Sequence, residues 1–179
     1  MADLVASETE SLAPGRYTRS GFEPIVTFEV GEGWYGVQQF EGFFDIQQDV
    51  GSPDVIAVQF ARPSAFVGAG GEHVPATTAA EAETVIQANP GLTVLGSSDS
   101  RLGGLEGRVV EVENTTGGGV EVMIVPPGPL SILDGRRLWI ALLETDGGLL
   151  AVLVGGSVAT WNQALATAEP VLESIQIRP

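Results

Sequence analysis

Ser157 has the sequence setting that most resembles that of a catalytic nucleophile. Two glycines precede it, an apolar strand-like run comes before them, and a helical pattern follows. This is the strand, turn and helix order of the nucleophile elbow in hydrolases, whose histidine comes after the serine in the chain. His73, the only histidine, lies far upstream. The order favours a helix-capping role for Ser157, and a serine hydrolase stays open as an alternative.

Three aspartates that lie close together in the sequence suggest a cation site. Asp45, Asp49 and Asp54 are accompanied by Gln47 and Gln48, and carboxylate and amide oxygens are the ligands that Ca²⁺ prefers. Their spacing does not match the loop of an EF-hand, in which the oxygen positions are set. A calcium-dependent binding module is therefore a second alternative.

A second group of acidic residues invites a different chemistry. Glu111, Glu113 and Glu121 are expected to share one face of a strand pair, and paired carboxylates can act as general acid and base. The chain has 23 acidic residues, so a solvated sheet edge explains the group equally well. His73 has neither a second histidine nor a cysteine with which to share a transition metal. We predict no cofactor and keep a carboxylate-based hydrolase as an alternative.

Five residues are the sequence's candidates for contact with a ligand. Tyr35, Phe43 and Phe44 belong to a stretch rich in aromatic residues. Because adjacent residues of a strand point to opposite faces, one of the two phenylalanines is expected to line a groove. Arg136 and Arg137 form the only adjacent cationic pair, and arginine is suited to hold a carboxylate or phosphate. A solvated hairpin tip is the simpler explanation for the pair.

The composition narrows the range of partners. The formal net charge is -15, and the eight cationic residues are all arginines scattered along the chain, whereas nucleic acids and anionic membranes attract clustered positive charge. Nucleic acid is therefore not an expected partner. The most apolar stretch, 138–156, contains Glu144 and Asp146 and is not expected to insert into a membrane. The richness in glycine and the lack of lysine suggest a GC-rich bacterial genome.

Strand-like segments separated by glycine-rich turns dominate the chain. Asp134-Gly135 and Asp146-Gly147-Gly148 suit tight hairpins, so neighbouring strands are expected to be antiparallel. The runs 138–143 and 149–154 are apolar without alternation, which predicts a sheet that is covered on both faces. Strands are expected at 16–20, 22–30, 34–40, 43–50, 55–61, 92–95, 105–113, 120–125, 137–144 and 149–154.

Two helices are expected to supply that cover. Thr78-Ala79-Ala80-Glu81 matches a capping box, and the helix that it begins should end at Asn89-Pro90-Gly91. The second helix begins near Ser157, and its apolar residues recur at helical spacing across Pro170. An interior proline removes a backbone hydrogen bond, so we expect the helix to bend or to restart near Ala168. These features predict an α+β protein, an antiparallel sheet with helices on both faces.

Short motifs resemble those of the PsbP-like superfamily. They are Phe22-Glu23-Pro24, Gly33-Trp34, the glycine-led strand 102–108, and the closing 170–175 segment. The resemblance implies an α/β/α sandwich, and the length of the chain fits a single domain, which we expect at residues 16–179. The small and polar residues at the start of the chain suggest a flexible linker at 1–15. The superfamily includes a photosystem subunit, Ran-binding factors, and exported bacterial proteins. No catalytic motif unites them, so the resemblance carries no functional residue to this chain.

The sequence therefore predicts a non-enzymatic binding or protein-interaction domain. We expect it to recognise an unknown protein or small molecule through a sheet edge or a groove lined by loops. The resemblance implies the extracytoplasmic or cell-surface part of an exported or anchored bacterial protein, although a cytoplasmic location is compatible with the sequence. A monomer or a weak dimer is expected.

Overall fold

The computed structural model describes residues 1–4, 10–126 and 128–178. Within them the protein is α+β, with mostly antiparallel sheets and two helices. The largest sheet has eight strands in antiparallel register. In spatial order these strands are β10 (Thr93–Leu102), β11 (Leu105–Asn114), β14 (Arg136–Thr145), β15 (Gly148–Ser157), β7 (Ile56–Ala61), β6 (Phe43–Gln48), β5 (Tyr35–Phe40) and β2 (Glu10–Ser11).

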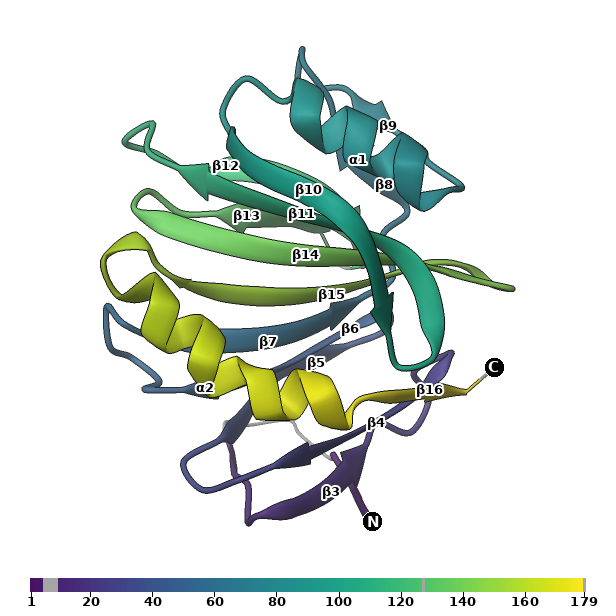
Figure 1. Ribbon diagram of the computed structural model, residues 1–179, viewed down its shortest axis with the longest axis vertical. Coiled ribbons are helices and arrows are strands. Elements are labelled where there is room, and N and C mark those ends of the chain that lie inside the picture. Colours follow the sequence, from purple (N-terminus) through teal and green to yellow (C-terminus); the bar gives the residue numbers. More distant parts are fainter. Residues whose placement is uncertain (5–9, 127, 179) are drawn as a thin grey trace.

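Two smaller sheets and two helices complete the structure (Figure 1). The first small sheet contains, in spatial order, β1 (Ala2–Asp3), β3 (Gly15–Thr18), β4 (Ile25–Val30) and β16 (Gln176–Arg178). The second contains β13 (Gly128–Ile132), β12 (Val120–Val125), β8 (Ala65–Val67) and β9 (His73–Val74). The helices are α1 (Ala79–Ala88) and α2 (Trp161–Ser174).

The central hairpin of β14 and β15 is buried on both faces, as its unbroken apolar runs predict. Ala141 and Leu143 belong to one core, which also contains Trp161 of α2 and residues of β4. Ile140 and Leu142 belong to a second core, which also contains Ile86 of α1 and residues of β12. Successive residues of one strand point to opposite faces, so each core receives every second residue. Residues of α2 and β4 share the first core with this hairpin, and residues of α1 and β12 share the second.

Helix α1 has the ends that the sequence predicts. The Thr78 side chain accepts from the backbone N–H of Glu81, and the Glu81 carboxylate accepts from the N–H of Thr78. This capping box satisfies two amide groups that a helix leaves unpaired at its start. The helix ends at Ala88, directly before Asn89-Pro90-Gly91.

The expected restart of the second helix near Ala168 is wrong. Helix α2 continues through Pro170 to Ser174. A proline leaves the carbonyl four residues earlier without its helical donor, here that of Ala166. Both residues are on the exposed side of the helix, where water can reach the carbonyl. The opposite side stays anchored by Ala168 and Val171 in the core.

The segment 1–15, expected to be a linker, supplies strands β1 and β2. Leu4 and Leu12 beside them are buried, and their backbone N–H groups donate to the carbonyls of Thr18 and Trp34. Burial of two leucines and pairing of their amides give this segment a stabilising contact with the rest of the fold. Residues 5–9 of the expected linker lie outside the described residues.

Like β1 and β2, strands β8, β9 and β13 lie outside the strands expected from the sequence. β8 and β9 lie between the expected strand 55–61 and the helix that begins after Thr78, and β13 lies in the proline-rich stretch that follows β12. Proline cannot donate to a neighbouring strand and is confined to sheet edges. β13 contains Pro129 and is an edge strand of its sheet.

Candidate functional site

A groove lies between strand β13 and the part of the large sheet formed by β5, β6 and β7. It consists of two adjoining hollows of about 340 Å³ and 450 Å³, which share Gln59 of β7 and Ser131 of β13 as lining residues. We call it the glutamine groove. It is lined by Gln38, Phe40, Phe43, Gln47, Ser52, Pro53, Val55, Ala57, Gln59, Val125, Pro126, Gly128, Pro129, Leu130, Ser131, Ile132, Leu133, Asp134, Arg136, Leu138 and Gly155.

The floor of the groove contains polar residues because the layer that packs over this face of the sheet ends there. On β15 the residues of this face, Ala151 and Leu153, are buried in the second core. Gln59, the register partner of Leu153 on β7, is only half-buried and lines both hollows. Its neighbours Val58 and Phe60 point to the other face, into the first core. Gln59, a polar residue in the middle of an apolar strand, thus marks the place where the layer packed over this face of the sheet ends.

Asp45 lies beneath this floor as a fully buried carboxylate, with 0% of its surface exposed. Strand β5 has an irregular register opposite it, where Gly36 pairs with Ile46 and Gln39 with Phe44. One extra residue on one strand is a β-bulge, which leaves a backbone group without its strand partner. The Oδ1 atom of Asp45 accepts from the N–H of Gln38 at 2.7 Å, inside this bulge.

Burial raises the pKa of Asp45 above its ordinary value. Hydrogen bonds from the Gln47 side chain, the Gln38 backbone and the Gln59 side chain act in the opposite direction, because they stabilise the charged carboxylate. The Gln47 side-chain amide donates to Oδ2 at 2.7 Å. Asp45 therefore holds in place, through these two hydrogen bonds, Gln38 and Gln47, which both line the groove.

The adjacent arginines point in different directions. Arg136 lines the groove, and its guanidinium donates to the carbonyls of Pro53 at 3.0 Å and Val55 at 2.6 Å. Burial lowers the pKa of Arg136, against the opposite effect of Asp54. Arg137 instead lies over the ring of Trp161, 5.4 Å from its centroid, and 3.8 Å from the carboxylate of Glu113. The structure therefore separates the pair, and only Arg136 lies at the groove.

The aromatic candidates are also divided. Phe43 lines the groove, whereas Phe44 is fully buried in the first core and stacks on Phe60, with 4.5 Å between ring centroids. Tyr35 is half-buried on β5 and is not among the residues that line the groove. Phe43 belongs to the second core and Phe44 to the first, so the two side chains point to opposite faces of the sheet, as strand alternation implies.

The three aspartates do not gather around one point. Asp45 is buried in β6, whereas Asp49 and Asp54 are exposed in the connection to β7. Asp54 accepts from the hydroxyl of Thr160 at 3.1 Å. Across residues 1–4, 10–126 and 128–178, no group of three or more histidine, aspartate or glutamate residues is placed to hold a metal ion.

The glutamates are likewise split between sheets. Glu111 and Glu113 are half-buried in β11, opposite Trp139 and Arg137 of β14. Glu121 is exposed in β12, which belongs to another sheet. The strand pair that would have brought all three carboxylates together does not form.

Ser157 has a capping geometry. Its hydroxyl accepts from the backbone N–H of Ala159 at 3.3 Å, at the start of a 3₁₀ turn (Val158–Thr160) that leads into α2. His73 is exposed in β9. Among the hydrogen bonds of the described chain, none joins Ser157 to a histidine or a carboxylate.

We expect Ser157→Ala to lower the free energy of unfolding by about 1 kcal/mol or less, the effect of losing one helix cap. Neither the variant nor the parent protein should react with a serine-directed fluorophosphonate probe. Urea unfolding and gel-based labelling measure the two outcomes, with Ser98→Ala on exposed β10 as the control. Labelling of the parent that disappears in Ser157→Ala would restore the hydrolase alternative.

Sequence reasoning missed the residues that shape the groove. Gln59 interrupts the apolar strand 56–61, and this interruption was the available signal. Ser131 carried no signal, because its strand lies among prolines that read as a loop. No helix of the described chain has the length and apolar character that crossing a bilayer requires.

Comparison with known proteins defines the fold. No protein-family model and no curated protein matches the sequence. The solution structure of cyanobacterial PsbP (CyanoP) from Synechocystis sp. PCC 6803 matches 98% of this chain and 99% of its own, with 15% identity and a TM-score of 0.51. LpqN, involved in cell envelope biogenesis of Mycobacterium tuberculosis, matches 99% of this chain and 89% of its own, with 11% identity and a TM-score of 0.48. The chain has a PsbP-like fold.

Proposed function

We propose that this protein is a non-enzymatic binding domain that holds an extended segment of a partner protein in the glutamine groove. The observation that carries the proposal is the half-buried row of amides on the groove floor, beneath an edge strand. Gln47 and Gln59 lie on adjacent strands, and both are half-buried and line the groove.

Side-chain amides suit a polypeptide backbone. Each glutamine offers N–H donors and a carbonyl acceptor, which are the groups that an extended backbone needs as partners. Asp45 fixes the orientation of the Gln47 amide by accepting one of its hydrogen bonds. An amide held in one orientation loses less conformational entropy when it binds a partner.

The ends of the groove suit apolar side chains. Phe40 is 46% exposed and lines one hollow, and Leu133 is 65% exposed and lines the other. Exposed apolar side chains at the rim of a groove gain free energy when a partner covers them. The net charge of -15 favours a basic partner, whose approach it would accelerate.

Selection from a library of random peptides tests the proposal. We expect selected peptides to contain apolar and basic residues and to bind the parent protein in a fluorescence polarisation assay. Ser131→Trp, which fills the groove, should weaken binding about tenfold or more, a loss in the range of interface hot spots. Ser98→Trp makes the same change on exposed β10 and should leave binding unchanged.

Two results would contradict the proposed function. One is a selection that yields no peptide with saturable binding to the folded protein. The other is equal binding of the selected peptides to the parent protein and to Ser131→Trp. Circular dichroism spectra of both tryptophan variants establish that each is folded before binding is compared.

The proposal includes an architecture, an assembly state and a location. We propose that residues 16–179 act as one α/β/α domain, a monomer or weak dimer in an extracytoplasmic or cell-surface setting, as the PsbP-like resemblance implies. Limited proteolysis with mass spectrometry, sedimentation and fractionation of the native bacterium measure these properties. Stable fragments from within 16–179, a tight oligomer or recovery in the cytosol alone would each contradict one part.

A further inference from the structure

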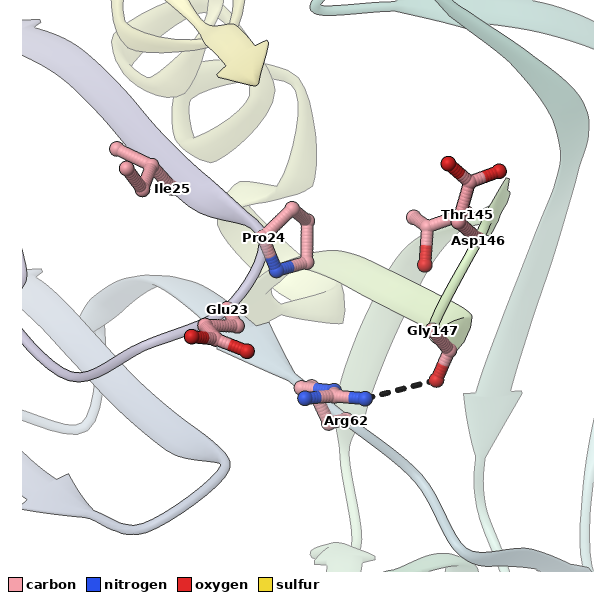
Figure 2. A pocket seen from close by; sticks show the side chains of 7 residues that line it. All are labelled: Glu23, Pro24, Ile25, Arg62, Thr145, Asp146 and Gly147. Carbon is pink, nitrogen blue, oxygen red and sulfur yellow. Dashed lines mark hydrogen bonds between the residues drawn. The ribbon is translucent and has the colours of Figure 1, made fainter. Parts of the chain in front are cut away.

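A second cleft lies at one end of the large sheet, away from the floor of the glutamine groove. It consists of two adjoining hollows of about 410 Å³ and 500 Å³, which share Glu23, Arg62 and Gly147. The residues come from loops: Arg62 follows β7, Glu23 precedes β4, and Gly147 lies in the turn between β14 and β15. Figure 2 shows the first hollow, with Arg62 between the two walls.

The Arg62 guanidinium is held in place and keeps donors free. One of its N–H groups donates to the carbonyl of Gly147 at 2.8 Å, and its backbone N–H donates to the carbonyl of Gly42 at 2.8 Å. In the described part of the chain, no carboxylate lies within ion-pair distance of Arg62. A guanidinium has five N–H donors in a planar fork that fits a carboxylate, so Arg62 retains donors for a ligand.

Two acidic side chains line the same hollow as this cation. Glu23 lies on the side of Pro24, and Asp146 projects from the opposite wall beside Thr145 (Figure 2). Asp146 is exposed and accepts no hydrogen bond from a described side chain or backbone group. A simple anion at Arg62 would be repelled by both carboxylates. A ligand that carries an ammonium group next to its carboxylate would instead be attracted by all three groups.

The remaining wall is apolar. Pro24 and Ile25 line the hollow, and Ile25 is 48% exposed. A ligand with an apolar side chain would remove this surface from water.

We propose that the cleft around Arg62 binds an apolar α-amino acid. The ligand carboxylate takes the free donors of Arg62, its ammonium group lies toward Glu23 and Asp146, and its side chain covers Pro24 and Ile25. Each of the three chemical groups of the ligand thus meets a matching group of the cleft. The site does not depend on the function proposed for the glutamine groove.

Isothermal titration calorimetry with L-leucine tests this assignment. Leucine should give saturable binding to the parent protein. L-Leucinamide, which lacks the carboxylate, and N-acetyl-L-leucine, which lacks the ammonium group, should each bind about tenfold or more weakly, since each loses charge-assisted hydrogen bonds. Arg62→Gln should reduce the affinity for leucine by a similar factor.

Matched variants keep the test decisive. Asp146→Asn changes an exposed turn residue and should weaken leucine binding even if Arg62→Gln fails to fold. Arg101→Gln, on exposed β10, and Ser131→Trp, in the glutamine groove, should leave leucine binding unchanged. No saturable heat with leucine, equal binding of N-acetyl-L-leucine, or unchanged binding in both Arg62→Gln and Asp146→Asn would overturn the proposal.

Discussion

Replacing Asp45 by alanine is expected to lower the free energy of unfolding by about 2 kcal/mol. The change removes a fully buried carboxylate that accepts from the Gln38 backbone and from the Gln47 side chain. Both donors would lose their partner in a site that water reaches poorly, and an unpaired donor there costs its desolvation energy. Urea unfolding followed by circular dichroism measures the effect.

Asp45→Asn is expected to cost much less than Asp45→Ala at neutral pH. Asparagine keeps the shape of the side chain and an oxygen that can accept from Gln38. The amide of Gln47 can turn to offer its carbonyl to the new NH₂ group. If Asp45→Asn destabilises the protein as strongly as Asp45→Ala, the hydrogen bonds are not the origin of the effect.

The pH dependence of stability provides a separate test of Asp45. Its pKa is raised in the folded protein from an ordinary value of 3.8, so the folded state binds the proton more tightly than the unfolded state. This contribution is fully present below the unfolded pKa, and it is lost as the pH rises from 3.8 through the folded pKa. Asp45→Asn removes the contribution, so its stability relative to the parent should increase with pH across that window.

Unfolding curves at closely spaced pH values measure this relative stability. The difference between parent and variant removes the contributions of the other acidic residues, which both proteins share. Asp146→Asn is the control, because Asp146 is exposed in a turn. A flat difference for Asp45→Asn between acidic and neutral pH would contradict the expected result.

Replacing Gly107 by alanine is expected to destabilise the protein by about 3 kcal/mol or more. Gly107 lies in β11 between Ser100 of β10 and Leu143 of β14. A Cβ atom at this position would overlap the carbonyl oxygen of Leu142 and would lie 3.1 Å from the Cα of Leu143. These are backbone atoms of a paired strand, so relief of the clash requires the strands to move apart.

Gly96→Ala is the matched control for this prediction. Gly96 also lies in the large sheet, on β10, and a Cβ atom there would meet no atom within 4 Å. Its substitution should change the free energy of unfolding by about 1 kcal/mol or less. Equal effects of the two substitutions in urea unfolding would show that the close approach at Gly107 is not what makes glycine necessary.

Features that depend on neighbours in the chain were predictable from the sequence. The capping box at Thr78 involves residues three positions apart. The apolar runs of β14 and β15 predict two buried faces, because strand periodicity sends alternate residues to each side. Ser157 was recognised as a cap from its place before a helical pattern. Pro170 shows the limit of local rules, because the packing of the opposite side of α2 outweighs the missing hydrogen bond.

The groove itself was decided by tertiary structure. Alternation predicted that one of Phe43 and Phe44 lines a groove, but no local pattern shows that Gln59 pairs with Leu153 or that the layer packed over the sheet ends there. Register between strands distant in sequence determines which side chains become neighbours.

By itself, the sequence determined an acidic, cysteine-free α+β chain with a capping box at the start of its first helix and a central hairpin that is buried on both faces. Tertiary structure decided that Pro129 belongs to an edge strand, that Asp45 is buried opposite a β-bulge and that Arg62 lines one cleft with two acidic residues. Secondary structure follows from local geometry and periodicity, whereas burial and the grouping of charges follow from which distant segments cover one another.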